Sequence, residues 1–124
     1  MAAVFLAIGS IAAFLAVALG AFGAHVLKRR LSAQMLANFQ TGVQYHMIHA
    51  VALLVLGGLW RSWGDLPLFP YAGWFFLAGI ILFSGSLYAL SLSGVKKLGA
   101  ITPLGGLCFL AGWLCLALAG LAGA

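Results

Sequence analysis

The sequence predicts an all-α integral membrane protein, a four-helix bundle of antiparallel, up-down topology. Two observations support this prediction. Hydrophobic residues make up 65% of the chain, and the mean hydropathy is +1.20, whereas soluble domains are only about 45–50% apolar. The six lysines and arginines fall into three short clusters that divide the chain into four apolar stretches. Each stretch exceeds the roughly 20 residues that a helix needs to cross about 30 Å of hydrocarbon. Residues 1–124 are therefore expected to form a single domain.

Each expected helix ends at a chemically recognisable break. The predicted helices cover about residues 3–27, 37–60, 69–93 and 98–122. The breaks are the basic run 28–30, the segment 61–70 with one glycine and two prolines, and the Gly-Val-Lys-Lys turn at 94–97. All backbone polar groups must be bonded inside lipid, and short loops make successive helices antiparallel.

The positions of the basic residues predict the orientation. Five of the six lie in the first and third loops, and only Arg61 lies in the second. The positive-inside rule then places the first and third loops in the cytoplasm and both termini outside, periplasmic or extracellular. The first stretch lacks a basic segment ahead of it, and its basic residues follow it, so we expect it to be retained rather than cleaved as a signal peptide.

The single acidic residue, Asp65, limits the possible functions. It lies outside every apolar stretch, so no intramembrane carboxylate is available for proton coupling, cation binding or a catalytic triad. Three histidines without a carboxylate at the same depth supply too few ligands for a typical zinc site. Haem ligation by two histidines would need His25 to lie at the same depth as His46 or His49. The basic residues form no surface stripe for nucleic acid. We expect no cofactor, no metal, no nucleic-acid partner and no enzymatic activity.

Polar residues within the apolar stretches mark the candidate site, because such groups normally face a bundle interior or a cavity. On the second helix Tyr45 and His49 share one face, and His46 lies about 60° to one side of it. We expect Tyr45 and His49 to face Ser84 and Tyr88 in one interhelical hydrogen-bond network in the cytoplasmic half. A small molecule or lipid headgroup could occupy the same place. The candidate residues are His25, Thr41, Gln44, Tyr45, His49, Ser84, Tyr88 and Thr102.

Small residues indicate where helices pack closely, since lipid supplies no hydrophobic drive for association. The first helix has such a ridge at Ala12, Ala16, Gly20 and Ala24. On the third, Gly79, Ser86 and Ser93 lie opposite the face with Ser84 and Tyr88, and the fourth has Gly105 and Gly112. We interpret most of the glycines as packing devices.

Five ordered motifs make the chain similar to a known family. They are Gly20-Ala21-Phe22-Gly23-Ala24-His25, Gln44-Tyr45 with His49, Phe69-Pro70-Tyr71-Ala72-Gly73, Phe83-Ser84-Gly85-Ser86-Leu87-Tyr88 and Thr102-Pro103-Leu104-Gly105-Gly106. In order and spacing they resemble the YgdD family of small bacterial inner-membrane proteins, a family of unknown function with a mitochondrial relative in animals. The resemblance implies a four-span membrane protein and no established reaction. It maps motif positions without assigned roles onto His25, Tyr45, His49, Ser84, Ser86, Tyr88, Thr102 and Pro103.

Three classes of function remain, in order of preference. The first is a non-catalytic structural or accessory component of the membrane that contacts lipids and associates with itself or with another membrane complex. The second is a small-solute or lipid-binding transporter or channel, although the carboxylate of small drug exporters is missing. The third is a membrane enzyme, in which Tyr45 and His49 would supply an acid and a base.

Overall fold

The computed structural model describes residues 1–123, which are almost entirely helical and contain no strand. Four helices are long and apolar enough to cross a membrane. Their elements are α1 (Ala2–His25), α2 (Ala33–Trp63), the continuous rod of α3 (Phe69–Gly79), the π-helical turn η2 (Ile80–Ser84) and α4 (Gly85–Ser93), and α5 (Thr102–Gly123). Short 3₁₀ turns, η1 (Leu27–Arg29) and η3 (Lys96–Ala100), follow the first and third spans. The prediction of an all-α protein with four apolar helices of spanning length is confirmed.

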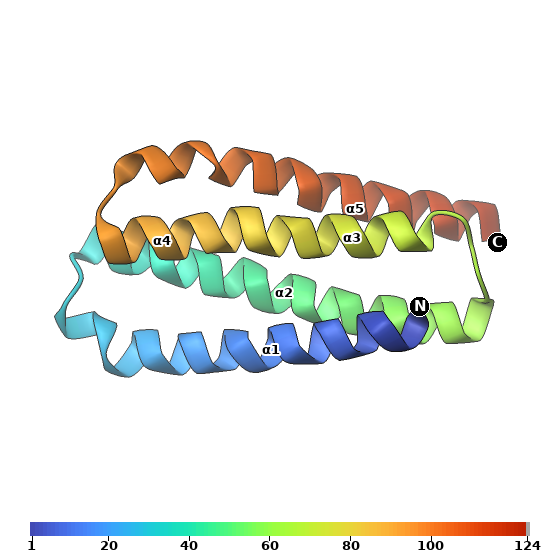
Figure 1. Ribbon diagram of the computed structural model, residues 1–124, viewed down its shortest axis with the longest axis horizontal. Coiled ribbons are helices and arrows are strands. Elements are labelled where there is room, and N and C mark those ends of the chain that lie inside the picture. The colour runs from blue at the N-terminus through green and yellow to red at the C-terminus, as the bar shows by residue number, and fades with distance from the viewer. Residues whose placement is uncertain (124) are drawn as a thin grey trace.

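The helices form a layered bundle in which α2 and the α3–η2–α4 rod occupy the centre. Each of the four spans in Figure 1 runs back along the one before it, with α3 and α4 together forming the third span, and the marked chain ends lie at the same end of the bundle. The outer helix α1 packs mainly against α2, and α5 packs mainly against α3 and η2. The outer helices therefore leave more of their side chains uncovered than the central ones do.

A side-chain cap and a 3₁₀ turn explain why two helices begin elsewhere than expected. α2 begins at Ala33, ahead of residue 37, because the Ser32 side chain accepts a hydrogen bond from the Met35 amide (3.1 Å) and caps the helix. α5 begins at Thr102, since residues 96–100 form the 3₁₀ turn η3. Gly94 ends α4 with φ of +76°, a left-handed conformation that glycine adopts without strain.

Phenylalanine rings seated on glycines of a neighbouring helix fill the core. A Cβ atom added at Gly73 would overlap the Phe5 ring, and one at Gly79 would overlap the Phe109 ring. Further along the bundle, a Cβ at Gly23 would lie 2.6 Å from Phe39, and one at Gly112 would lie 2.6 Å from Phe76. Each glycine thus makes space for one ring, and the interpretation of glycines as packing devices holds at these positions.

The small-residue ridges agree with the structure in part. Ala12 and Ala16 are buried, as are Gly79, Ser86, Gly105 and Gly112. Ala24 and Ser93 are exposed, and the buried glycine near the end of α1 is Gly23. At the end of α1, Gly23 rather than Ala24 therefore makes the close contact, and it faces Phe39 of α2.

The single carboxylate has a structural partner at the end of the bundle that includes residues 60–69. Trp60 is buried against Phe5 and Phe69, and its indole N–H donates a hydrogen bond to Asp65. Asp65 lies in the loop that follows α2. The carboxylate therefore helps to hold this loop against the bundle.

Candidate functional site

Two histidines of α2, His46 and His49, lie near the middle of the bundle and face different neighbours. Both are buried, and they lie one turn apart on a helix that runs from Ala33 to Trp63. His46 bonds to α4, and His49 bonds to α5. A separate lateral groove adjoins each ring.

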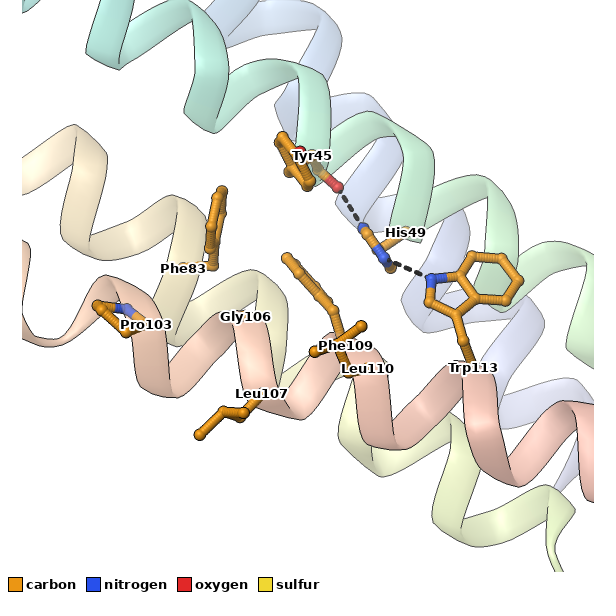
Figure 2. Close-up of a pocket in the computed structure, with 9 residues that line it drawn as sticks. All are labelled: Tyr45, His49, Phe83, Pro103, Gly106, Leu107, Phe109, Leu110 and Trp113. Carbon is orange, nitrogen blue, oxygen red and sulfur yellow. Dashed lines mark hydrogen bonds between the residues drawn. The ribbon is translucent and has the colours of Figure 1, made fainter.

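Hydrogen bonds determine the tautomer of His49. The Trp113 indole N–H donates to His49 Nε2 (2.9 Å), and the Tyr45 carbonyl lies 2.7 Å from His49 Nδ1 (Figure 2). An indole nitrogen can only donate and a carbonyl oxygen can only accept. His49 is therefore neutral, with its proton on Nδ1, and both ring nitrogens are occupied.

Aromatic rings surround His49 on several sides. The Phe109 ring stacks on the imidazole, with centroids 3.6 Å apart and planes 7° from parallel. Phe76 and Trp113 approach at centroid distances of 5.6 and 5.7 Å. Stacked and edge-on rings fix the orientation of the imidazole in addition to its hydrogen bonds.

The groove beside His49 lies between α2 and α5, and Phe83 of η2 also lines it. Its volume is about 420 Å³. Figure 2 shows Phe83 of η2 and Phe109 and Trp113 of α5 pointing toward the side of α2 that carries Tyr45 and His49. The lining residues are Tyr45, His49, Phe83, Pro103, Gly106, Leu107, Phe109, Leu110 and Trp113. We call this the aromatic groove.

A second groove, of about 370 Å³, lies between α1 and the α3–η2 rod, with His46 in its lining. A hydrogen bond of 2.8 Å joins His46 Nδ1 to the Tyr88 hydroxyl of α4. The other lining residues are Ile8, Ile11, Ala12, Leu15, Leu77, Ile80 and Ile81, all of them aliphatic. We call this the aliphatic groove.

The hydroxyls of the third span bond to helices on both of its sides. Ser84, which is completely buried, donates to the Gly42 carbonyl of α2 (2.7 Å). Ser86 donates to the Phe83 carbonyl (2.9 Å), which uses its only proton, so Thr102 of α5 donates to Ser86 at 2.6 Å. The sequence places Ser84 and Ser86 on opposite faces of this span, and they bond to two different helices, α2 and α5.

The structure divides the expected single network into two parts. Tyr88 bonds to His46 rather than to His49, and the side-chain partner of His49 is Trp113. The hydroxyl of the candidate residue Thr102 bonds to Ser86 of the third span. The expected pairing of His49 with Tyr88 is therefore wrong, because α5, not α4, lies beside this face of α2.

Several candidate residues lie apart from these contacts. His25, Thr41 and Gln44 are exposed on the outer surface of the bundle. Tyr45 is 39% exposed at the aromatic groove, and its ring packs on Phe83 with centroids 4.6 Å apart. Thr41 lies close to Tyr45 and His49 by its helical angle, yet neither Thr41 nor Gln44 belongs to the buried residues of α2.

His46, Phe109 and Trp113 were not among the candidate site residues expected from the sequence, and one signal identifies His46. The buried residues of α2 follow alternating steps of three and four: Phe39, Gly42, His46, His49, Leu53, Leu56 and Trp60. This is the spacing of a helix seam packed against partners. His46 and His49 both belong to this seam, whereas Thr41 and Tyr45 do not.

Residues 1–123 contain no group of three or more His, Cys, Asp or Glu side chains placed to hold a metal ion. His49 has both ring nitrogens occupied by protein atoms. The side chains around the two histidines are apolar, aromatic or hydroxyl-bearing. The arrangement is suited to helix packing and to contact with uncharged molecules.

These features define a small, multi-helical membrane protein whose internal polar groups bond between helices. The chain belongs to the DUF423 family, described as proteins of unknown function, whose pattern matches residues 19–106. This agrees with the resemblance stated from the motifs.

The relatives carry names of the same kind. The chain is 48% identical over 116 residues to the UPF0382 membrane protein YwdK of Bacillus subtilis, covering 94% of each chain. It is 44% identical over 115 residues to the UPF0382 membrane protein SAB0533 of Staphylococcus aureus, covering 93% of each. It is 40% identical over 111 residues to the UPF0382 inner membrane protein YgdD of Escherichia coli, covering 84% of this chain and 79% of that relative. No solved structure matches the chain.

Proposed function

We propose that the protein is a non-catalytic structural or accessory component of a bacterial inner membrane. One observation supports this most directly: the polar groups inside the bundle are used to hold its helices together. Of the five buried polar side chains in residues 1–123, four are hydrogen-bonded, and only the Ser91 hydroxyl lacks a partner. A bundle whose internal polar groups are occupied in this way has little left with which to carry out acid–base chemistry.

The outer helices offer the surface for association with another membrane protein or with further copies of the chain. Phe14 of α1 is 72% exposed, and Leu114 of α5 is 60% exposed. Both lie on long apolar helices that contact few neighbours within the bundle. In lipid, such faces associate through close packing rather than through a hydrophobic drive.

The proposed topology is antiparallel in the membrane, with both termini outside. The five basic residues of the first and third loops support it. A periplasm-active reporter fused after residue 124 should be active, and the same reporter inserted between residues 31 and 37 should be inactive. A cytoplasmic C-terminus would contradict this topology.

Photo-crosslinking in native membranes tests the accessory role. A photoreactive phenylalanine analogue replaces Phe14 in one variant and Leu114 in another, and Phe39, which is buried, is replaced as the control. A discrete protein adduct from an outer position, absent from the Phe39 control, is the expected result. Adducts with lipid alone from both outer positions would reject the association.

A transporter or channel remains the alternative, and a liposome flux measurement tests it. Purified protein in liposomes should leave the flux of small ions and neutral solutes at the level of empty liposomes. A flux that depends on the protein would favour the transporter over the accessory role.

A further inference from the structure

The aromatic groove is accessible from the side of the bundle. Leu107 and Leu110, on the outer surface of α5, line it together with Trp113, which is 42% exposed. These residues belong to an apolar helix of spanning length. A molecule that enters the groove must therefore come from the hydrocarbon of the membrane.

The lining of the groove disfavours a charged ligand. None of its nine lining residues is Lys, Arg, Asp or Glu. An ionised group at this depth would lose its hydration without gaining a counter-ion, which costs free energy. The groove therefore suits an uncharged, lipid-soluble molecule rather than a phospholipid headgroup or an inorganic ion.

The walls of the groove are flat. Tyr45, Phe83, Phe109 and Trp113 supply four aromatic rings. The Tyr45 ring lies within 16° of parallel to the Phe109 ring, at a centroid distance of 6.3 Å. The aliphatic groove on the other side of the bundle is lined by branched chains instead. Aromatic faces favour a planar ring through stacking, whereas an acyl chain gains nothing from their flatness.

One hydrogen-bond donor in the lining is unused. The Tyr45 main chain bonds within α2 and its carbonyl also accepts from His49, but among residues 1–123 the phenol O–H of Tyr45 has no protein partner. Trp113 and His49 already satisfy each other. A free phenol near the middle of an apolar span would be stabilised by an acceptor on a bound molecule.

We propose that the aromatic groove binds a lipid-soluble quinone, with a ring carbonyl accepting a hydrogen bond from the Tyr45 hydroxyl. A quinone is planar and uncharged, its carbonyls only accept, and its tail can extend into the surrounding lipid. The groove volume of about 420 Å³ lies within the usual range of small-molecule sites. This binding is independent of the accessory role, since association through the outer faces of α1 and α5 does not require it.

Gly106 provides the decisive variant. A Cβ atom at Gly106 meets nothing closer than 3.9 Å, at Phe83, so Gly106→Leu places a side chain in the groove without a main-chain clash. Gly120 lies on the same helix, has nothing within 4 Å of an added Cβ and does not line the groove. Gly120→Leu is therefore a matched control with the same added volume.

Two probes separate a quinone site from a general apolar groove. Decylubiquinone carries ring carbonyls, and decylbenzene has a ring and the same chain length but no acceptor. Protein in phosphatidylcholine nanodiscs is titrated with each probe, and bound ligand is measured by native mass spectrometry. We expect decylubiquinone to bind more tightly than decylbenzene to the wild type and to Gly120→Leu, and to bind at least about tenfold more weakly to Gly106→Leu.

Tyr45→Phe tests the proposed hydrogen bond without filling the groove. Removing one such bond should weaken decylubiquinone binding about three- to tenfold and leave decylbenzene binding unchanged. If circular dichroism shows that Gly106→Leu does not fold, the Tyr45→Phe variant tests the proposed quinone site by itself. Equal binding of the two probes to the wild type, no binding of decylubiquinone, or wild-type affinity in a folded Gly106→Leu would each overturn the proposal.

Discussion

The aromatic and aliphatic grooves differ in their walls more than in their size. Both lie beside a histidine of α2, and their volumes are about 420 and 370 Å³. His49 is surrounded by aromatic rings and bonds to an indole, whereas His46 lies among branched aliphatic chains and bonds to a phenol. Two identical side chains one turn apart on one helix thus acquire different surroundings, because each faces a different neighbouring helix.

This comparison shows how a polar residue can be retained in a membrane protein for different reasons. The bond from His46 to Tyr88 joins the two central elements, α2 and α4. The bond from Trp113 to His49 ties the outer helix α5 to α2 beside an open groove. The first contact stabilises the middle of the bundle, and the second also shapes a surface that a ligand can reach.

The largest expected effect comes from the close approach of α5 to η2 at the edge of the aromatic groove. A Cβ at Gly105 would overlap the main chain of Phe83, which cannot move aside as a side-chain tip can. Gly105→Ala should therefore lower the free energy of unfolding by about 2–3 kcal/mol. The measurement is unfolding in mixed detergent micelles followed by circular dichroism.

Gly106→Ala is the control for this prediction, because its Cβ makes only an ordinary contact. It should leave stability unchanged or raise it by up to about 1 kcal/mol, since alanine favours the helix. Similar losses in the two variants would mean that α5 does not approach η2 as described.

The next effect compares the two histidines directly. His49→Leu removes the Trp113 bond and the stacking on Phe109, and it should destabilise the bundle by about 1–2 kcal/mol without preventing membrane insertion. His46→Leu removes the Tyr88 bond and should cost about 0.6 kcal/mol. The same unfolding measurement applies, and an equal or larger loss for His46→Leu would contradict the ranking.

A conservative variant, His49→Gln, separates the contribution of the His49 hydrogen bond from that of its ring stacking. The His49→Gln side chain has a carbonyl oxygen that can accept from the Trp113 indole. It should recover part of the stability lost in His49→Leu. A variant as unstable as His49→Leu would indicate that ring stacking, rather than the hydrogen bond, holds α5 to α2.

A smaller effect is expected for the coupling between His46 and Tyr88. In a double-mutant cycle of His46→Leu and Tyr88→Phe, the interaction energy should be about 0.6 kcal/mol, the average for hydrogen bonds between membrane helices. The pair of His49→Leu and Tyr88→Phe serves as the control and should show additive losses. Strong coupling in the control would restore the single network expected from the sequence.

The last prediction concerns bound cofactors, for which we expect no signal. The two histidines face different helices, and protein atoms occupy both nitrogens of His49. Purified protein should therefore be colourless and free of stoichiometric metal, as measured by absorption and elemental analysis. A haem absorption band near equimolar haem would refute this prediction.

The sequence by itself determined the class of protein and the way its helices approach one another. Four apolar stretches separated by basic clusters leave few alternatives to membrane helices, because backbone groups in lipid must bond within each segment. Gly79, Gly105 and Gly112 were also identifiable as close-approach positions, since only small residues permit such contacts. The opposite faces of Ser84 and Ser86 followed from helical periodicity alone.

Only the tertiary structure decided which polar residues meet. Thr41, Tyr45 and His49 cluster on one face by their angles, but the packed seam of α2 runs through Gly42, His46 and His49. Periodicity gives the angle of a side chain about its own helix and does not say which neighbour fills that direction. The partner of His49 lies 64 residues away on α5, and it was settled by Phe109 seating on Gly79 and by α5 approaching η2 at Gly105. Such contacts depend on the volumes of side chains from several helices at once, which no single segment of sequence contains.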